Sequence, residues 1–178
     1  WPFVKQRPYD IVANPNATPK SIFVSGYATA PLAADMDYVL QGKEAQLQAA
    51  ITALGKLTPG KVHVSVGASS KSPLAGLSGI ELHKVSGPHP SGLVGTQINR
   101  IDPVNKGETV WTVAPQDLVI IGELILTGVY NPERVIALAG SCVKTPKYYT
   151  TKIGAEISTF LYGSGVTNDN FRVINGDV

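Results

Sequence analysis

The sequence contains almost no cysteine and no long apolar run, and both shortages exclude whole classes of protein. Cys142 is the only cysteine, so the chain cannot form an internal disulfide or hold an iron–sulfur cluster or zinc ion through cysteines alone. The longest apolar run, residues 118–126, is interrupted by Gly122 and Glu123 and is far shorter than the about 20 residues that a membrane span needs. The sequence therefore predicts no membrane-spanning segment.

Charged residues are also scarce. They make up 16% of the 178 residues, against 43% hydrophobic residues, so we expect a substantial core and a surface partly covered by partners. The net charge is only +2 and the basic residues are scattered, which predicts no nucleic-acid binding. The sequence shows no signal peptide, and it begins at Trp1 without a methionine. We therefore expect a middle piece of a longer protein.

Strand-like and helix-like segments alternate through the first two-thirds of the chain. Residues 21–25 (SIFVS) predict a short buried strand, residues 43–57 an amphipathic helix, and residues 61–66 a strand with alternating valines. Residues 80–85 predict a third strand. This spacing favours parallel strands joined by a helical crossover.

Glycine and proline are concentrated around residues 87–96, where we expect a turn that leads into a short helix. The turn Gly87-Pro88-His89-Pro90 cannot be helix or inner strand. The free N–H groups of a helix start near Gly95 would favour a polar or anionic group. We expect the backbone at Gly95 to be crowded. A β-prone run, residues 108–113, and a helix that begins at Pro115 follow.

Loops that follow strands of an α/β sheet commonly bind ligands, so residues in such loops and at the helix start are candidate ligand-binding residues. The candidate loop and helix-start residues are Gly26, His89, Gly92, Gly95 and Thr96.

Two pairs of side chains are candidate metal ligands. Asp35 and Asp37 could bind a cation through oxygen, although a solvated acidic loop is favoured. His83 and His89 are six residues apart, but no third ligand is evident nearby. The sequence therefore predicts no metal site.

Three long stretches carry a resemblance to a known family: GPHPSGLVGTQINRIDPV, VWTVAPQDLVIIGELILTG and RVIALAGSCVKTP. They resemble the middle of the A subunit of the bacterial sodium-translocating NADH:quinone oxidoreductase, and the resemblance extends over the whole chain. It implies an α/β fold with a Rossmann-like parallel-sheet domain over residues 20–130, similar to the flavin subunit of respiratory complex I. Residues 1–19 would form an N-terminal strap or linker, and residues 131–178 a small soluble-ligand-binding β-grasp domain.

The pattern near the C-terminus agrees with a β-grasp domain. Strand-like residues around 135–139 and 147–151 precede a helix predicted at residues 156–162, and residues 171–174 predict a closing strand. A ligand-binding β-grasp module with an incidental first domain is a further alternative.

A glycine-rich loop cradles the flavin phosphate in the flavin-bearing relatives, and this chain lacks it. Residues 1–8 contain no glycine but two prolines, Pro2 and Pro8, which have no N–H to donate. No catalytic set of side chains is evident either. The resemblance therefore implies a non-flavin peripheral subunit on the cytoplasmic side of the bacterial inner membrane, with FMN and NADH handled by other subunits. The alternative is a flavin-dependent NADH dehydrogenase domain with its own FMN site.

The implied role is in quinone binding or access and in assembly with other subunits of a membrane-embedded redox pump. Phe3, Arg7 and Tyr9 are the predicted quinone contacts, because an aromatic side chain can stack on the quinone ring and Arg7 can donate hydrogen bonds to a carbonyl oxygen. A strap that only packs over the next domain is the alternative. Pro2 and Pro8 are expected to keep residues 1–10 out of a helix or central strand.

Overall fold

The computed structural model describes residues 1–167 and 170–176. The chain divides into two compact units. The first contains residues 1–29 and 35–131, and the second contains residues 30–34 and 132–178.

A six-stranded sheet forms the centre of the first unit, with the strand order β2-β1-β6-β3-β4-β5. Four of its strands are mutually parallel: β3 (Ile22–Ser25), β4 (Val62–Gly67), β5 (Glu81–Val85) and β6 (Val110–Thr112). They coincide with the four strand-like segments of the sequence, so the predicted parallel crossover from β3 to β4 is confirmed.

The N-terminal segment joins this sheet, contrary to the prediction. Strand β1 (Lys5–Arg7) lies antiparallel between β2 (Ile11–Val12) and β6. The prediction that prolines keep residues 1–10 out of an inner strand was wrong, because Pro2 and Pro8 flank β1 and leave its three N–H groups intact.

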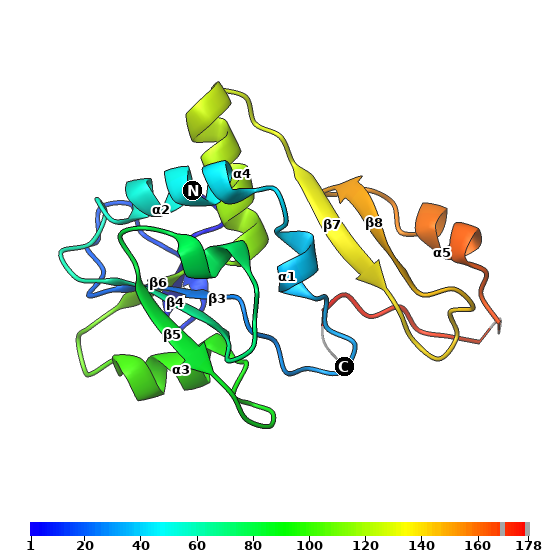
Figure 1. The fold of residues 1–178 in the computed structure, drawn as a ribbon, viewed down its shortest axis with the longest axis horizontal. Helices are drawn as coiled ribbons and strands as arrows, with labels where there is room; N and C mark the ends of the chain where they lie inside the picture. The colour runs from blue at the N-terminus through cyan, green and yellow to red at the C-terminus, as the bar shows by residue number, and fades with distance from the viewer. Residues whose placement is uncertain (168–169, 177–178) are drawn as a thin grey trace. The chain divides into compact units, whose positions relative to one another are not determined.

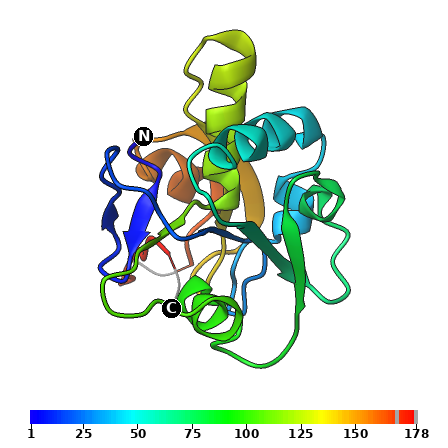
Figure 2. The ribbon, with the colours of Figure 1, turned by 90° about the vertical axis from the view of Figure 1, so that its left-hand side faces the viewer.

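Helices cover both faces of the sheet, as Figures 1 and 2 show. Helices α2 (Glu44–Leu54) and α4 (Pro115–Thr127) pack together on one face, and α3 (Val94–Ile101) lies on the other. A Cβ at Gly122 of α4 would overlap the carbonyl oxygen of Gln46, so glycine lets the two helix backbones approach. The predicted helices at residues 43–57, after Gly92 and at Pro115 are confirmed. The short helix α1 (Met36–Val39) and the 3-10 turn η1 (Pro73–Gly76) complete the unit.

The core of the first unit forms from the apolar faces that the sequence pattern predicts. Below α3, Phe23 and Val110 of the sheet pack against Ile98. Each such fully buried apolar side chain contributes about 1.5–3 kcal/mol. On the opposite face the buried side chains include Leu47, Ala50, Ile51, Leu54, Val62, Val64, Val66 and Leu118.

The second unit is built on an antiparallel pair of strands, β7 (Glu133–Leu138) and β8 (Lys147–Lys152), followed by α5 (Ser158–Ser164). The rings of Tyr149 and Phe160 lie 5.2 Å apart and join the hairpin to the helix. The predicted closing strand at residues 171–174 was wrong. These residues are described but form no strand, and their apolar side chains are about half exposed because no sheet edge in the described chain pairs with them.

None of the helices that the structure describes is both long enough and apolar enough to cross a membrane.

Candidate functional site

The carboxyl ends of β3 and β6 mark the place where the order of the parallel strands reverses. From β3 the chain runs to β4 and β5 on one side, and it then returns to β6 on the other side of β3. In open α/β sheets, ligands bind outside the strand ends at such a switch point. The loop after β3 and the turn at residues 87–92 meet here.

Hydrogen bonds connect the loop after β3 to the turn at residues 87–92. The Gly92 N–H donates to Thr29 Oγ1 over 3.1 Å, and His89 Nδ1 lies 3.2 Å from the same oxygen. The Ser25 hydroxyl donates to the Gly92 carbonyl over 3.4 Å. His89 and Gly92, predicted from the sequence, are thus brought together with Thr29, which was not predicted.

Two of the predicted glycines are required for close packing at this place. A Cβ at Gly92 would lie 2.5 Å from the Thr29 backbone nitrogen, and one at Gly26 would lie 2.5 Å from Leu74 Cδ1. The expectation that Gly95 is crowded was wrong, because a Cβ there meets only the flexible end of Arg7, at 3.1 Å from Nη2. The tight approach occurs three residues earlier, where the turn packs on Thr29.

Arg7 is brought to the start of α3. Its guanidinium lies against Gly95, and Thr96 follows in the same first helical turn. The helix cap residue Leu93 makes no side-chain capping bond within the described chain. The first N–H groups of a helix carry a partial positive charge, which adds to that of Arg7. Both groups favour an anion or a polarised carbonyl oxygen. Arg7 also pairs with the exposed Asp10 carboxylate over 3.4 Å.

The two predicted aromatic contacts are not brought together. Phe3 precedes β1 and is half-buried, whereas Tyr9 follows β1 in the turn to β2 and is 77% exposed. They therefore lie at opposite ends of the strand. Trp1, which was not predicted, packs edge-on against the buried Trp111 with ring centroids 5.3 Å apart.

The acidic pair at the start of α1 serves the fold. Asp35 accepts a hydrogen bond from the Asp37 N–H and caps α1. The Asp37 carboxylate accepts from the Ser70 hydroxyl at 2.5 Å and from the Lys71 N–H at 2.7 Å. These bonds account for both carboxylates without a cation.

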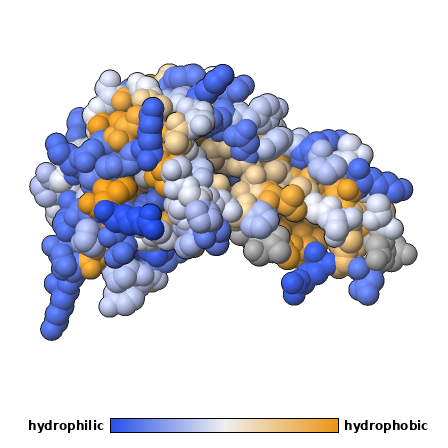
Figure 3. Space-filling model, turned by 60° about the horizontal axis from the view of Figure 1, so that its bottom comes forward, coloured by the Kyte–Doolittle hydropathy of each residue, from blue (hydrophilic) through white to orange (hydrophobic). Residues whose placement is uncertain are grey.

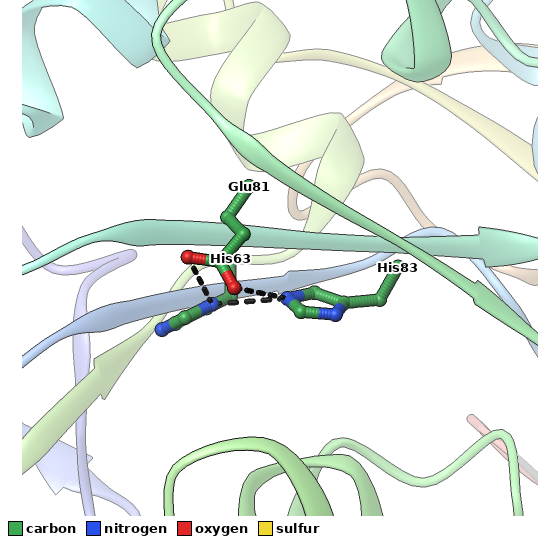
Figure 4. Close-up of side chains that lie close together, drawn as sticks. All are labelled: His63, Glu81 and His83. Atoms are coloured by element: carbon green, nitrogen blue, oxygen red, sulfur yellow. Dashed lines mark hydrogen bonds and ion pairs between the residues drawn. The ribbon is translucent and has the colours of Figure 1, made fainter.

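A second group of polar side chains lies on β4 and β5, as Figure 4 shows. His63 Nδ1 is 3.0 Å from His83 Nε2, and the two carboxylate oxygens of Glu81 lie 4.0 Å and 3.9 Å from these nitrogens. His83 and His89, weighed in the sequence as candidate metal ligands, do not pair with each other: His83 meets His63, and His89 lies against Thr29. Burial lowers the pKa of His63, against the opposing effect of the Glu81 carboxylate.

Sequence reasoning missed His63 and Glu81 as a group. The signal was present: His63 occupies the polar side of its strand, and Glu81 and His83 are two residues apart on the next parallel strand. Side chains two apart share a face, so the missing step was the register between the strands.

Comparison with known proteins identifies the family. The family model described as the NqrA second alpha/beta domain matches residues 1–130, and the NQRA C-terminal domain matches residues 135–178. The chain belongs to the NqrA family. The resemblance seen in the sequence is thereby confirmed.

Curated relatives of this NqrA chain are named as the A subunit of Na(+)-translocating NADH-quinone reductase. Over all 178 residues the chain is 40% identical to the protein of Neisseria meningitidis serogroup B, 39% to that of Pseudomonas aeruginosa PAO1 and 38% to that of Rhodopirellula baltica. It spans 40%, 39% and 39% of their respective lengths.

Proposed function

We propose that this NqrA chain is a peripheral, non-flavin part of a Na(+)-translocating NADH-quinone reductase on the cytoplasmic side of the bacterial inner membrane. Its role is quinone binding or access and assembly with the other subunits of the pump. The complex oxidises NADH and reduces quinone, while this chain supplies no catalytic group. FMN and NADH are handled by other subunits.

The contact of Arg7 with the start of α3 carries the quinone proposal. A quinone is a flat, mostly apolar ring with two carbonyl oxygens, so it suits a few hydrogen-bond donors beside apolar or aromatic side chains. Arg7 and the N–H groups near Gly95 and Thr96 supply donors at one point. The same donors would stabilise the negative charge that develops on the oxygen during reduction. Phe3, just before β1, offers an aromatic face.

In the first unit, the backbone N–H groups of β1 are engaged in strand pairing and two glycines are packed against other residues, which supports a flavin-free role. A phosphate cradle needs unpaired N–H groups and glycines open to the ligand. Here β1 pairs with β6 and β2, while Gly26 and Gly92 are packed against Leu74 and Thr29. A domain with its own FMN site, the alternative function, would need these contacts to open.

Exposed apolar residues support a role in assembly. The last turns of α4 and the residues after it carry Leu124, Ile125, Leu126, Val129 and Tyr130, each 44–64% exposed. Figure 3 shows hydrophobic residues in several separate patches among hydrophilic ones on the face drawn. Apolar surface of this kind is commonly covered by partner proteins. We propose that other subunits of the pump cover it.

At the level of fold, we propose that residues 20–130 form a Rossmann-like domain related to the flavin subunit of complex I. The strands β1 and β2 would then be an antiparallel addition to its sheet. We propose a β-grasp relationship for residues 131–178, on the basis of the hairpin and helix.

Photo-crosslinking in the assembled complex tests the quinone role. A quinone analogue bearing a photoreactive azide is bound, irradiated and located by peptide mass spectrometry, with excess unlabelled quinone as the competitor. We expect competed label on residues 1–10 or 92–96. Competed label found entirely on other segments or subunits would contradict the proposal.

Titration with FMN separates the flavin alternative. The isolated chain is mixed with FMN in a calorimeter, and absorbance near 450 nm is read after gel filtration. We expect no retained colour. A one-to-one complex with a micromolar or tighter dissociation constant would favour the FMN-binding domain instead.

A further inference from the structure

The register of two parallel strands places three potential metal ligands on one face of the sheet. Glu81 of β5 pairs with His63 of β4, and His83 lies two residues further along β5, opposite Ser65. Since residues two apart in a strand share a face, all three side chains point the same way. Their donor atoms lie within 4.8 Å of one another.

From this geometry we propose that His63, Glu81 and His83 form a binding site for a divalent transition metal ion, with zinc as the best match. Two imidazoles and one carboxylate with an open fourth position are a ligand set that zinc uses. The nitrogen and oxygen donors also suit nickel, copper and cobalt, whereas magnesium and calcium require mostly oxygen.

The distances between donors are close to those of a tetrahedral site. Bonds of about 2.0–2.1 Å at tetrahedral angles put neighbouring donors roughly 3.3 Å apart. The nitrogens of His63 and His83 are 3.0 Å apart, and Glu81 oxygens lie at 4.0 Å and 3.9 Å from them. Glu81 is half exposed, so a small rotation of its side chain supplies the remaining roughly 0.7 Å.

The ring of His63 is already held in place for this role. It is 6% exposed and stacks on Phe23 with ring centroids 4.7 Å apart and an angle of 27° between the planes. A ligand fixed by packing loses little conformational freedom when it binds. Glu81 and the partly exposed His83 leave a path for the ion from solvent.

Binding requires no net loss of a proton from the two neutral imidazoles. In the metal-free state, one ring donates to the other through the contact of Nδ1 with Nε2. When the ion binds, Nδ1 of His63 and Nε2 of His83 each give it a lone pair. The proton that one of these two nitrogens carried moves to the other nitrogen of the same ring. The buried Ser65 hydroxyl, which has no hydrogen-bond partner within the described chain, lies on the same face as His63. It is a candidate partner for a water molecule on the fourth position.

The site is separate from the proposed quinone site. His63 and Glu81 lie near the amino ends of β4 and β5, whereas the start of α3, with Gly95 of the proposed quinone site, follows the turn at residues 87–92 after the carboxyl end of β5. β5 is an edge strand of the sheet. A metal ion here would attach this edge strand to its neighbour, so its effect would be on stability.

Zinc titration of the tag-free chain, stripped of metal with EDTA and then dialysed, tests the proposal. We expect one zinc ion per chain by competition with a chromophoric chelator. Zinc at 100 times its dissociation constant should raise Tm by about 5–10 °C. Cobalt should give the intense visible absorption bands of a four-coordinate site.

Three variants locate the ion. H83Q and E81Q should each weaken zinc binding by more than about 100-fold, since loss of a group that only orients a ligand costs about 10–100-fold. Both side chains are partly exposed, so these variants should fold, as circular dichroism would check. The control H89Q removes the third histidine of the chain, which lies outside the group, and should bind zinc as the wild type does.

Zinc binding weaker than about 100 µM in the wild type, well short of the affinity of structural zinc sites, would overturn the proposal. Wild-type affinity in both H83Q and E81Q would overturn it as well. Because Cys142 can also bind zinc, C142S is titrated in parallel, and loss of binding in that variant would assign the ion to the thiol instead.

Discussion

The guanidinium of Arg7 lies against Gly95, 88 positions later in the chain, such that a Cβ at Gly95 would come within 3.1 Å of Arg7 Nη2. Strand β1 brings Arg7 to this place by pairing with β6, and α3 brings Gly95 there by packing on the same sheet. The contact places a full positive charge beside the positive end of a helix. Such an arrangement is stabilised when an anionic or carbonyl oxygen binds between the two.

Loss of Arg7 should therefore weaken quinone binding. We expect Arg7→Ala to raise the dissociation constant of the assembled complex for a quinone by about 10- to 150-fold, which corresponds to about 1.5–3 kcal/mol for a hydrogen bond from a charged donor. Equilibrium binding of a labelled quinone analogue measures it. The control is Lys5→Ala, a cation on the same side of β1. Unchanged affinity in an Arg7→Ala, Phe3→Ala double variant that still assembles would show that residues 1–10 only pack on the fold.

Gly92 and Gly95 should respond oppositely to alanine. Gly92→Ala places a Cβ against the Thr29 backbone, which cannot move without opening the loop, so we expect a loss of about 1–3 kcal/mol in the free energy of unfolding. Gly95→Ala displaces only the end of Arg7 and should be neutral or stabilising by up to about 1 kcal/mol. Urea unfolding monitored by tryptophan fluorescence measures both. Equal effects of the two changes would contradict the packing of the turn on Thr29.

Gly122 should be the most sensitive helical glycine of the first unit. A Cβ there overlaps the Gln46 carbonyl, so Gly122→Ala must separate α2 from α4, at a cost of about 3 kcal/mol or more. The matched control is Gly55→Ala at the end of α2, where a Cβ makes only ordinary contacts at 3.5 Å and the backbone is right-handed. Thermal unfolding of the two variants should differ clearly, with Gly55→Ala close to the wild type. A Tm for Gly122→Ala within about 2 °C of the control would show that the helices adjust freely.

An ion network at Lys20 should stabilise the first unit at neutral pH and lose its effect in acid. Lys20 Nζ lies 2.6 Å from an Asp102 oxygen and 3.0 Å from a Glu108 oxygen. Burial alone would raise the pKa of Asp102, but the hydrogen bonds from Lys20 and Ser21 outweigh it and lower that pKa. A hydrogen bond from the Asn105 backbone, together with Lys20, lowers the pKa of Glu108.

The sign of the pH dependence follows from these directions. A carboxylate whose pKa is lower in the folded than in the unfolded state stabilises the fold above its ordinary pKa, near 4, and loses this effect as the pH falls through the folded value. In Lys20→Met the loss of stability should thus be present at pH 6–7 and should shrink below about pH 4. Denaturant unfolding from pH 3 to 7 measures it, with the exposed Lys56→Met as the control. A difference between Lys20→Met and wild type that stays constant over this range would exclude these carboxylates as its source.

The periodicity of apolar residues and the spacing of the segments predicted most helices and strands of the first unit. Alternating valines predicted β4, the stripe from Leu47 to Leu54 predicted α2, and Pro115 marked the start of α4. These signals are local, because they depend on the repeat of a strand or helix and on the missing N–H of proline. The long stretch around residues 87–104 was also enough to indicate the family that the comparisons show.

Strand pairing between segments that are distant in the sequence could not be predicted from such local patterns. Lys5–Arg7 carries no strand pattern and becomes β1 only because β6 offers an open edge. Conversely, residues 171–174 have a strand-like composition but find no partner in the described chain. Strand formation depends on what lies beside a segment as much as on its own residues.

The sequence by itself determined the family, the parallel α/β character of the first unit and the positions of its helices, because each depends on neighbours a few residues apart. Only the tertiary structure decided that Arg7 reaches Gly95, that Gly92 rather than Gly95 is the crowded glycine, and that His63 shares one face with Glu81 and His83. These contacts join residues that are 18 to 88 positions apart, and they follow from strand register and helix packing, which a single sequence does not encode in any short pattern.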